Sequence, residues 1–168
     1  MELLNRIKNS KNPIFGVYHK LGPKLMGAML SYWGPFLGAG IRITHISEDF
    51  TQINAELRNR LYNKNLFGVH FGGAIYALVD PFYVLMLVKG LGRDFIVWDK
   101  SAEVKFLKPG KGTLRAEFHI STEEMEGIRK TVLNKKRYLF KKNIEVLNDK
   151  DEVVASIDKV VSIKLKDA

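Results

Sequence analysis

Asp80 is the only charged residue in an apolar and aromatic segment that covers residues 74–88. A segment of this composition is expected to be buried on most sides, and a buried carboxylate without a partner costs several kcal/mol. The carboxylate is therefore expected to be paired, protonated or used in a reaction. In a reaction two roles are open to it, as the general base that activates a water molecule or as the direct nucleophile.

Two glycines, Gly72 and Gly73, stand at the start of the same segment and follow a loop that begins at Asn65. Main-chain N–H groups at a helix start have no partner within the helix and lie at the positive end of its dipole. Glycine at that point lets a ligand come close to the main chain. We therefore expect the N–H groups of residues 71–73 to stabilise a carbonyl oxygen as it gains negative charge. Asn65 is expected to orient that carbonyl or the attacking water.

Each of these residues also has a structural interpretation. Asp80 followed by Pro81 is typical of a helix start, with Asp as the cap and Pro as the first residue. A continuous helix would instead be kinked at the proline, and the apolar spacing before Asp80 favours this second interpretation. The glycine pair is also typical of close packing between a helix and a sheet. For His70 a structural role is at least as well supported as catalysis. Tyr76 and Tyr83 are expected first as core residues and second as residues that line a ligand pocket.

Most of the remaining sequence alternates apolar and polar residues in short segments, which is typical of half-buried strands. Strands are predicted over residues 41–46, 50–57, 95–106, 114–120, 139–147 and 153–165. A single long apolar helix is predicted over residues 70–88. The short connections between strands indicate an antiparallel sheet, and a curved sheet can bury a helix that is apolar on all sides.

The ends of the helical segments carry further signals. One or two helices are predicted over residues 14–33, with an interruption near Gly22. Residues 122–131 form a short acidic-then-basic segment with an N-cap at Ser121 or Thr122. We divide the chain into an N-terminal helical extension, packed on the core, and a main domain that starts at residue 39.

Composition limits the class of protein. The chain has 168 residues and no cysteine, which fits a single cytoplasmic domain without disulfides or thiolate metal sites. No histidine spacing suggests a metal site of another kind. The net charge is +9, but aromatic residues do not alternate with the basic ones as a stacking platform requires, so nucleic-acid binding is ranked low. No secretory signal is evident, and the apolar segments 25–40 and 74–88 are too short to span a bilayer, which predicts no stable membrane insertion.

The predicted arrangement resembles the hotdog fold, an α+β fold in which a curved antiparallel sheet wraps one long central helix. The local motif resembles that of acyl-CoA thioesterases with this fold. Their ordered pattern of Asn, Gly, a glycine pair and an acid is matched by Asn65, Gly68, Gly72, Gly73 and Asp80. The strand end at 106–109 also resembles the family's aromatic-x-x-Pro. More closely, residues 65–109 resemble a thioesterase-like branch that carries His-Phe-Gly-Gly and Trp-Asp-Lys.

This resemblance implies hydrolysis of acyl-CoA thioesters, with a catalytic set of Asp80, Asn65, Gly72 and Gly73. It implies substrate contacts from His70, Phe71, Tyr76, Tyr83, Asp99, Lys108 and Lys111. The chain departs from the family at two positions. Phe71 stands where the family usually has His, and His70 lies one residue earlier. Asp99 stands where many members have Ser or Thr, and it is either a second site carboxylate or a partner of Lys100 or Lys105.

The resemblance further implies that the coenzyme A thioester is the substrate and that the reaction needs no cofactor. It also implies that the protein is a homodimer or homotetramer. Asn65 and Gly72 would come from one subunit and Asp80 from its partner. Coenzyme A carries several phosphates, and basic residues at the rim would steer it; the candidates are Lys105, Lys108, Lys111 and the cluster at 135–142. Two alternatives stay open, a non-catalytic acyl-CoA or lipid-binding hotdog module and a hotdog dehydratase or hydratase that would need His70.

Overall fold

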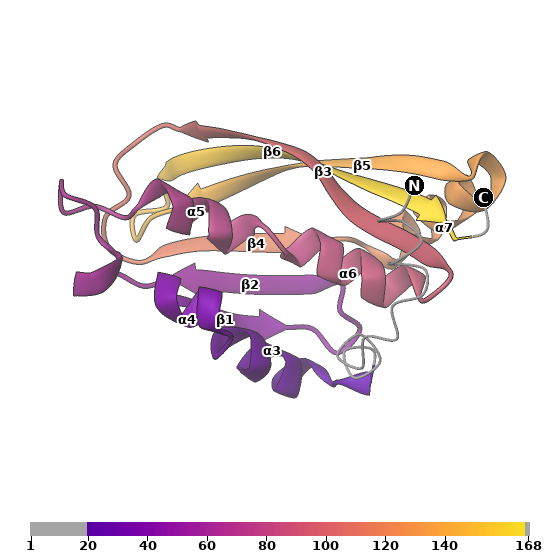
Figure 1. Ribbon diagram of the computed structural model, residues 1–168, viewed down its shortest axis with the longest axis horizontal. Coiled ribbons are helices and arrows are strands. Elements are labelled where there is room, and N and C mark those ends of the chain that lie inside the picture. The colour runs from indigo at the N-terminus through magenta and orange to yellow at the C-terminus, as the bar shows by residue number, and fades with distance from the viewer. Residues whose placement is uncertain (1–19, 167–168) are drawn as a thin grey trace.

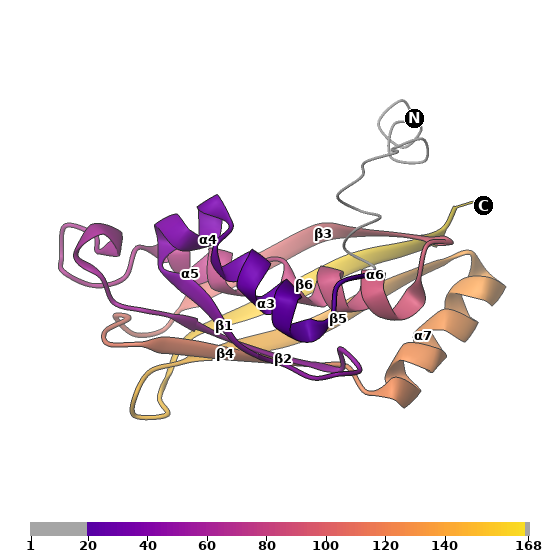
Figure 2. The same ribbon diagram turned by 90° about the horizontal axis from the view of Figure 1, so that it is seen from below.

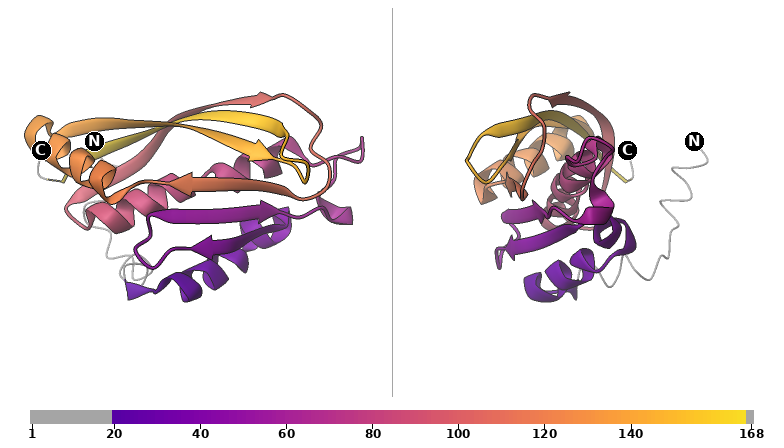
Figure 3. Two further views of the ribbon diagram at one scale, coloured as in Figure 1. Left: turned by 180° about the vertical axis from the view of Figure 1, so that it is seen from behind. Right: turned by 90° about the vertical axis from the view of Figure 1, so that its left-hand side faces the viewer.

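The computed structural model describes residues 20–166, which form one curved antiparallel sheet and several helices. The sheet has six strands in the order β1-β2-β4-β5-β6-β3. They are β1 (Ile41–Ile46), β2 (Gln52–Leu57), β3 (Phe95–Phe106), β4 (Leu114–His119), β5 (Arg137–Leu147) and β6 (Val153–Leu165). The sheet bends around two consecutive helices, α5 (Gly72–Val79) and α6 (Phe82–Leu91) (Figures 1 and 3). The predicted α+β hotdog fold is thereby confirmed.

Alternation of side chains explains why the strands form where they do. Inward residues of β2 and β4 face each other in register and are buried, as the pairs Ile53–Phe118, Ala55–Ala116 and Leu57–Leu114. The predicted bounds of β3 and β6 agree with the structure. The predicted strand at 50–57 begins two residues later, because Phe50 has a φ of 59° and belongs to the preceding turn. The strand predicted from residue 139 begins at Arg137.

Asp80 and Pro81 form a kink that separates α5 from α6 within the central helical segment. Asp80 (φ −61°, ψ −57°) and Pro81 (φ −89°, ψ −16°) both keep right-handed helical backbone. The kink at the proline is therefore confirmed, but the helix is not continuous, since α5 ends at Val79 and α6 begins at Phe82. Asp80 gives α6 no side-chain cap. Core residues on both sides of the kink are fully buried, among them Leu78, Val79, Phe82 and Leu87. The helical segment starts at Gly72 and ends at Leu91, slightly later than predicted at both ends.

The same helical segment is also longer than the sequence suggested. Gly72–Leu91 spans 20 residues and is long and apolar enough to cross a bilayer, whereas residues 74–88 alone were expected to be too short. The sheet of the same chain wraps this segment, and 56% of its most apolar window is buried within the protein. The segment is therefore the core helix of this fold.

Two short helices, α3 (Pro23–Ser31) and α4 (Gly34–Ala39), cover the outer side of the edge strand β1 (Figure 2). They bury Met26, Leu30 and Phe36 against the core. The Ser31 hydroxyl accepts a hydrogen bond from the Ile43 N–H at 3.0 Å and thereby pairs one donor of β1. Helix α3 starts directly after Gly22, as the predicted interruption requires. The part of the predicted helix before residue 20 lies outside the described residues.

The segment after Ser121 is a full helix, α7 (Thr122–Lys135), and not the short segment that was predicted. Ser121 is its N-cap and accepts a hydrogen bond from the Glu124 N–H at 3.1 Å. Helix α7 buries one stripe, made of Met125, Ile128 and Val132. It ends at Lys136, which adopts a left-handed conformation before β5 begins.

Candidate active site

The start of α5 presents two free main-chain donors. Within residues 20–166, no acceptor binds the N–H groups of Gly72 and Gly73. The N–H of Phe71, which was expected to share this role, instead donates to the Asn63 carbonyl at 3.3 Å. Side chains at the two glycine positions would collide with the rings of Phe106 and Phe71 respectively. The glycines therefore serve both packing and access to the main chain, and the two interpretations of this pair are compatible.

Asn65 shapes the loop that leads into the helix. Its Oδ1 atom accepts hydrogen bonds from the N–H groups of Phe67 (2.9 Å) and Val69 (3.3 Å). Gly68, with a φ of 74°, closes the turn by donating its N–H to the Asn65 carbonyl at 3.0 Å. The amide oxygen is thus committed to the loop, and only Nδ2 can act on a ligand. Asn65 contributes to the site by holding the loop as well as through its own side chain.

His70 has a structural role in this loop. Its ring is 3% exposed, and Nε2 lies 2.7 Å from the Gly112 carbonyl, which makes Nε2 the protonated nitrogen. Nδ1 is buried and has no partner among the described residues. The main-chain N–H of His70 also donates to the Gly110 carbonyl at 2.9 Å. These contacts tie the helix start to residues 110–112 and leave the imidazole poorly placed for acid–base chemistry on a ligand.

A hollow of about 610 Å³ lies beside the helix start. Six of its lining residues are Asn65, His70, Gly72, Phe106, Lys108 and Lys111. Five of these six were predicted as site residues, and the structure brings them together. A second hollow of about 390 Å³ adjoins it, with Phe71 and Gly73 in its wall and Asn65 shared between the two. Asp80 lines neither hollow.

Asp80 belongs to a separate charged cluster, centred on Lys159 of β6. The Lys159 ammonium lies 3.1 Å from Asp80 Oδ1 and 3.1 Å from Asp99 Oδ1. It also donates a short hydrogen bond to the main-chain carbonyl of Asp80, at the break between α5 and α6. Lys159 is 1% exposed, while the side chains of Asp80 and Asp99 are 45% and 36% exposed. The expectation that Asp80 would be largely buried is wrong. Of the three alternatives for this carboxylate, the structure shows that it is paired.

Burial and charge act in opposite directions on Asp99. Burial raises the pKa of the Asp99 carboxyl above its ordinary value, the Lys159 charge opposes this, and the nearby Asp80 adds to it. The contact with Lys159 is an ion pair without good hydrogen-bond geometry, since Asp99 Oδ1 has no hydrogen-bond partner among the described residues. The two carboxylates share one ammonium, which leaves the cluster with a formal charge of −1 when both are ionised.

The two tyrosines predicted as site residues lie in different parts of the structure. Tyr76 lies one turn before Asp80, and its ring is 5.8 Å from the Lys159 ammonium. Burial, followed by a hydrogen bond to Asp80, raises the pKa of Tyr76 to about 12, so its hydroxyl stays protonated and acts as a donor. Tyr83 is buried in the core against Phe118 and Phe140, as its structural interpretation predicts.

Lys159 is the site residue that sequence reasoning missed. The inward positions of β6 read Ala155, Ile157, Lys159, Val161 and Ile163, and all five are buried. A charged residue in an inward register of a strand was the available signal, because such a position requires a partner. Its partners, Asp99 and Asp80, are 60 and 79 residues away in the sequence, so no local pattern could predict them. Lys105, one of the expected partners of Asp99, pairs with Glu103 and Asp158 instead.

Comparison with known proteins places the chain in a family. Residues 22–163 match the family model described as a domain of unknown function, DUF4442. The chain belongs to this family. A search of curated protein sequences gives no match. No group of three or more His, Asp or Glu side chains in the described part of the chain could hold a metal ion.

Several solved structures share the fold of this DUF4442 protein. A probable thioesterase from Pseudomonas aeruginosa is 16% identical, with a TM-score of 0.75, and the match covers 84% of this chain and 95% of that one. A thioesterase from Haemophilus influenzae is 17% identical, with a TM-score of 0.62 and coverage of 85% and 90%. The Escherichia coli PaaI protein of the phenylacetic acid degradation operon is 17% identical, with a TM-score of 0.55 and coverage of 82% and 89%. At these identities the likeness establishes the hotdog fold alone.

Removing Lys159 is expected to destabilise the protein. Lys159→Met leaves two carboxylates near each other without their cation. Because these acids are half-exposed and solvent screens them, we expect a loss of about 1–3 kcal/mol, less than for a fully buried pair. Urea unfolding at neutral pH measures the loss. The exposed Lys100→Met is the control and should be nearly neutral. A Lys159→Met protein as stable as wild type would contradict the described cluster.

Asp99 is expected to make stability fall as pH rises. A carboxyl group with a raised folded-state pKa binds more protons in the folded than in the unfolded chain between its ordinary value, 3.8, and the raised value. This contribution to the free energy of unfolding is therefore present at the acidic end of that window and is lost as pH rises through it. Asp99→Asn should flatten this dependence in urea unfolding across mildly acidic pH, whereas the exposed Asp94→Asn should leave it unchanged.

Proposed function

We propose that this DUF4442 protein hydrolyses acyl-CoA thioesters, with the free N–H groups of Gly72 and Gly73 and the carboxylate of Asp80 as its active parts. The thioesterase-like fold supports this proposal. The single observation that carries it is the acid fixed by a buried lysine on the same helical segment that offers two unpaired donors at its start.

The reaction needs a stabilised oxygen and an attacking group. The carbonyl oxygen of the thioester accepts hydrogen bonds from the two glycine N–H groups, where the helix dipole is also positive. A water molecule attacks the carbonyl carbon and gives a proton to Asp80, or Asp80 attacks directly and the resulting anhydride is then hydrolysed. The carbon–sulfur bond breaks, and the sulfur leaves as a thiol after taking up a proton.

Lys159 and Tyr76 act through Asp80 in this proposal. The Lys159 ammonium contacts the main-chain carbonyl and Oδ1 of Asp80, and it also contacts Asp99. Lys159 therefore positions the acid and does not contact the substrate. Tyr76 lies one turn before Asp80, and its protonated hydroxyl is available as a donor to that acid. No metal or cofactor is needed by this chemistry, and the absence of cysteine fits a reducing compartment such as the cytoplasm.

We infer that two subunits build each site, and the helix geometry supports this. Asp80 follows Gly73 by seven residues, and an α-helix rises 1.5 Å per residue, so roughly 10 Å of helix separates the acid from the donors. One carbonyl group cannot contact both in a single chain. Strand β3 is the outer strand of the sheet on the side of Asp99, and it presents a long unpaired edge. Pairing of two β3 edges in a homodimer would cover that edge and the half-exposed acids.

The acid itself is tested by Asp80→Asn. The amide is nearly isosteric and can still accept from Lys159, so the fold should persist, while turnover of acyl-CoA should fall roughly a hundredfold or more. Thiol release from a panel of acyl-CoA substrates measures this loss. Asp94→Asn, at an exposed position, is the matched control. Wild-type turnover in the Asp80→Asn protein would favour the non-catalytic binding module, while the committed ring of His70 gives the hydratase alternative little support.

Sharing of the site between subunits is tested by complementation. Asp80→Asn and Gly73→Val each inactivate a different half of the site, and co-refolding the two variants creates mixed dimers with one intact site. Random mixing should restore about a quarter of wild-type activity, since half of the dimers are mixed and each has one working site of two. Light scattering should show at least a dimer at micromolar concentration. A monomer, or no recovery on mixing, would contradict the shared site.

A further inference from the structure

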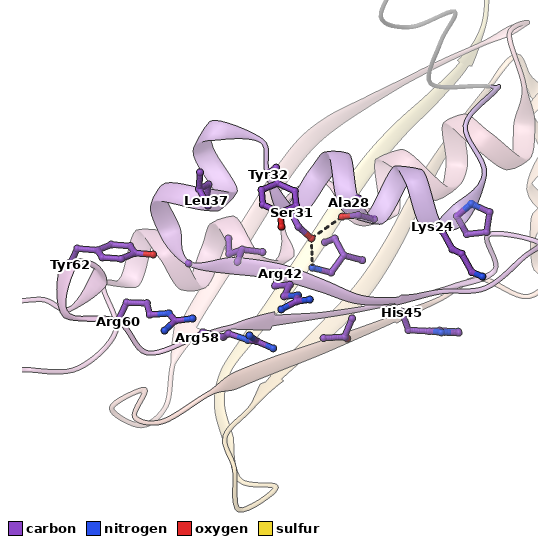
Figure 4. Close-up of a pocket in the computed structure, with 16 residues that line it drawn as sticks. Lys24, Ala28, Ser31, Tyr32, Leu37, Arg42, His45, Arg58, Arg60 and Tyr62 are labelled. Carbon is purple, nitrogen blue, oxygen red and sulfur yellow. Dashed lines mark hydrogen bonds between the residues drawn. The ribbon is translucent and has the colours of Figure 1, made fainter.

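A basic groove of about 590 Å³ runs along the edge strand β1, beneath α3 and α4. Four cationic side chains line it, Lys24, Arg42, Arg58 and Arg60. Figure 4 shows the three arginines reaching toward the same space from β1 and from the end of β2, with Tyr62 beside them. No Asp or Glu is among the residues that line the groove. Such a concentration of one sign of charge in a concave surface favours an anionic ligand.

Most of this charge is not neutralised within the chain. Arg58 pairs with Glu56 at 3.1 Å. Among residues 20–166, Lys24, Arg42 and Arg60 form no ion pair, although Arg42 lies opposite Glu56 in the β1–β2 register. Uncompensated cations in one groove repel each other, and a bound anion would relieve that repulsion. The groove is therefore better suited to a ligand than to a structural role.

The donor types indicate phosphate. Guanidinium groups present planar pairs of N–H donors that match phosphate oxygens, and arginine is favoured wherever phosphate is recognised. Two exposed aromatic side chains, Tyr32 (77%) and Tyr62 (67%), stand at the groove and can stack on a base. Phosphates combined with a flat ring system describe a nucleotide.

The groove is joined to the start of α5 by a buried asparagine. Asn63 is 6% exposed, and its Nδ2 donates to the carbonyls of Arg58 (2.7 Å) and Ala39 (2.8 Å). The Asn63 carbonyl accepts from the N–H of Phe71, the residue before Gly72. Tyr62 lines both the groove and the hollow that contains Gly73. Hydrogen bonds of Asn63 thus connect the segment that carries Arg58 to the helix start, and Tyr62 borders both hollows.

We propose that the basic groove binds the nucleotide end of the thioester substrate, with Arg42 and Arg60 contacting its phosphates and the acyl end lying at Gly72 and Gly73. This inference rests on the proposed function for the identity of the ligand. It assigns the phosphate contacts to β1 and the loop after β2, and not to Lys108, whose ammonium pairs with Glu152 at 2.8 Å. It also gives α3 a function, since this helix forms one wall of the groove.

The test compares a groove variant with a charge-matched control in the full chain. Arg42→Gln with Arg60→Gln removes two groove cations at exposed positions, and Arg93→Gln with Lys130→Gln removes two exposed cations elsewhere. Calorimetry then measures binding of coenzyme A, of adenosine 3′,5′-bisphosphate and of pantetheine, which lacks phosphate. We expect the groove variant to bind the first two at least ~10-fold more weakly, and the control to bind them as wild type does.

Steady-state kinetics add an independent readout. The groove variant should show a raised KM for an acyl-CoA with little change in kcat, and unchanged kinetics with an acyl-pantetheine, because only binding of the phosphates is lost. Equal weakening in both double variants, or equal binding of a DNA oligonucleotide and coenzyme A, would mean unspecific attraction and overturn the proposal, as would wild-type affinity in the groove variant. Groove-dependent binding without hydrolysis would leave this inference standing and refute the proposed function.

Discussion

The ion pair between Lys159 and Asp80 is the interaction on which the candidate site depends. An ammonium that is 1% exposed loses its hydration, and three oxygen atoms on two elements replace it. The contact fixes strand β6 to the helical segment at the kink made by Pro81, where the segment would otherwise be free to bend. A lysine in this position depends on its acids, because an ammonium that is 1% exposed would be a costly buried charge without them, whereas the half-exposed acids keep part of their hydration.

The kinked helix then sets the distance between the two halves of the chemistry. Its start offers the free N–H groups of Gly72 and Gly73, and its break holds Asp80 roughly 10 Å further along the axis. One carbonyl cannot contact both halves in a single chain, and for this reason the proposed site takes one half from each of two subunits. The half-exposed acids and the open edge of β3 agree with this reasoning, since both lie where a partner would cover them.

Local patterns in the sequence predicted what depends on neighbours in the chain. Alternation located β3 and β6 to the residue, and the Asp-Pro pair located the kink. Helix α7 was underestimated because its polar face dominates its composition, and only one stripe is buried. Local patterns could not predict contacts between segments that are distant in the sequence. Lys159 meets Asp99 through the register of β6 with β3, which pairs Val161 with Asp99, and it meets Asp80 because the central helical segment packs on the sheet. The hydrogen bonds of Asn65 within its own loop and of His70 with Gly112 also depend on the folded geometry.

The positions of the unpaired basic side chains also depend on contacts between distant segments, so the sequence did not predict them. They change the place at which the protein would attract its proposed substrate. The sequence suggested lysines around 105–111 as the rim that attracts phosphates. In the structure, Lys105 lies near Glu103 and Asp158, and Lys108 pairs with Glu152, so much of that charge is cancelled locally. Arg42 and Arg60 have no such partner among the described residues. An attractive field depends on charge that remains uncompensated within about a Debye length, roughly 8–10 Å. The edge of β1 is therefore a stronger source of steering than the end of β3, even though the acyl chemistry is expected at the start of α5.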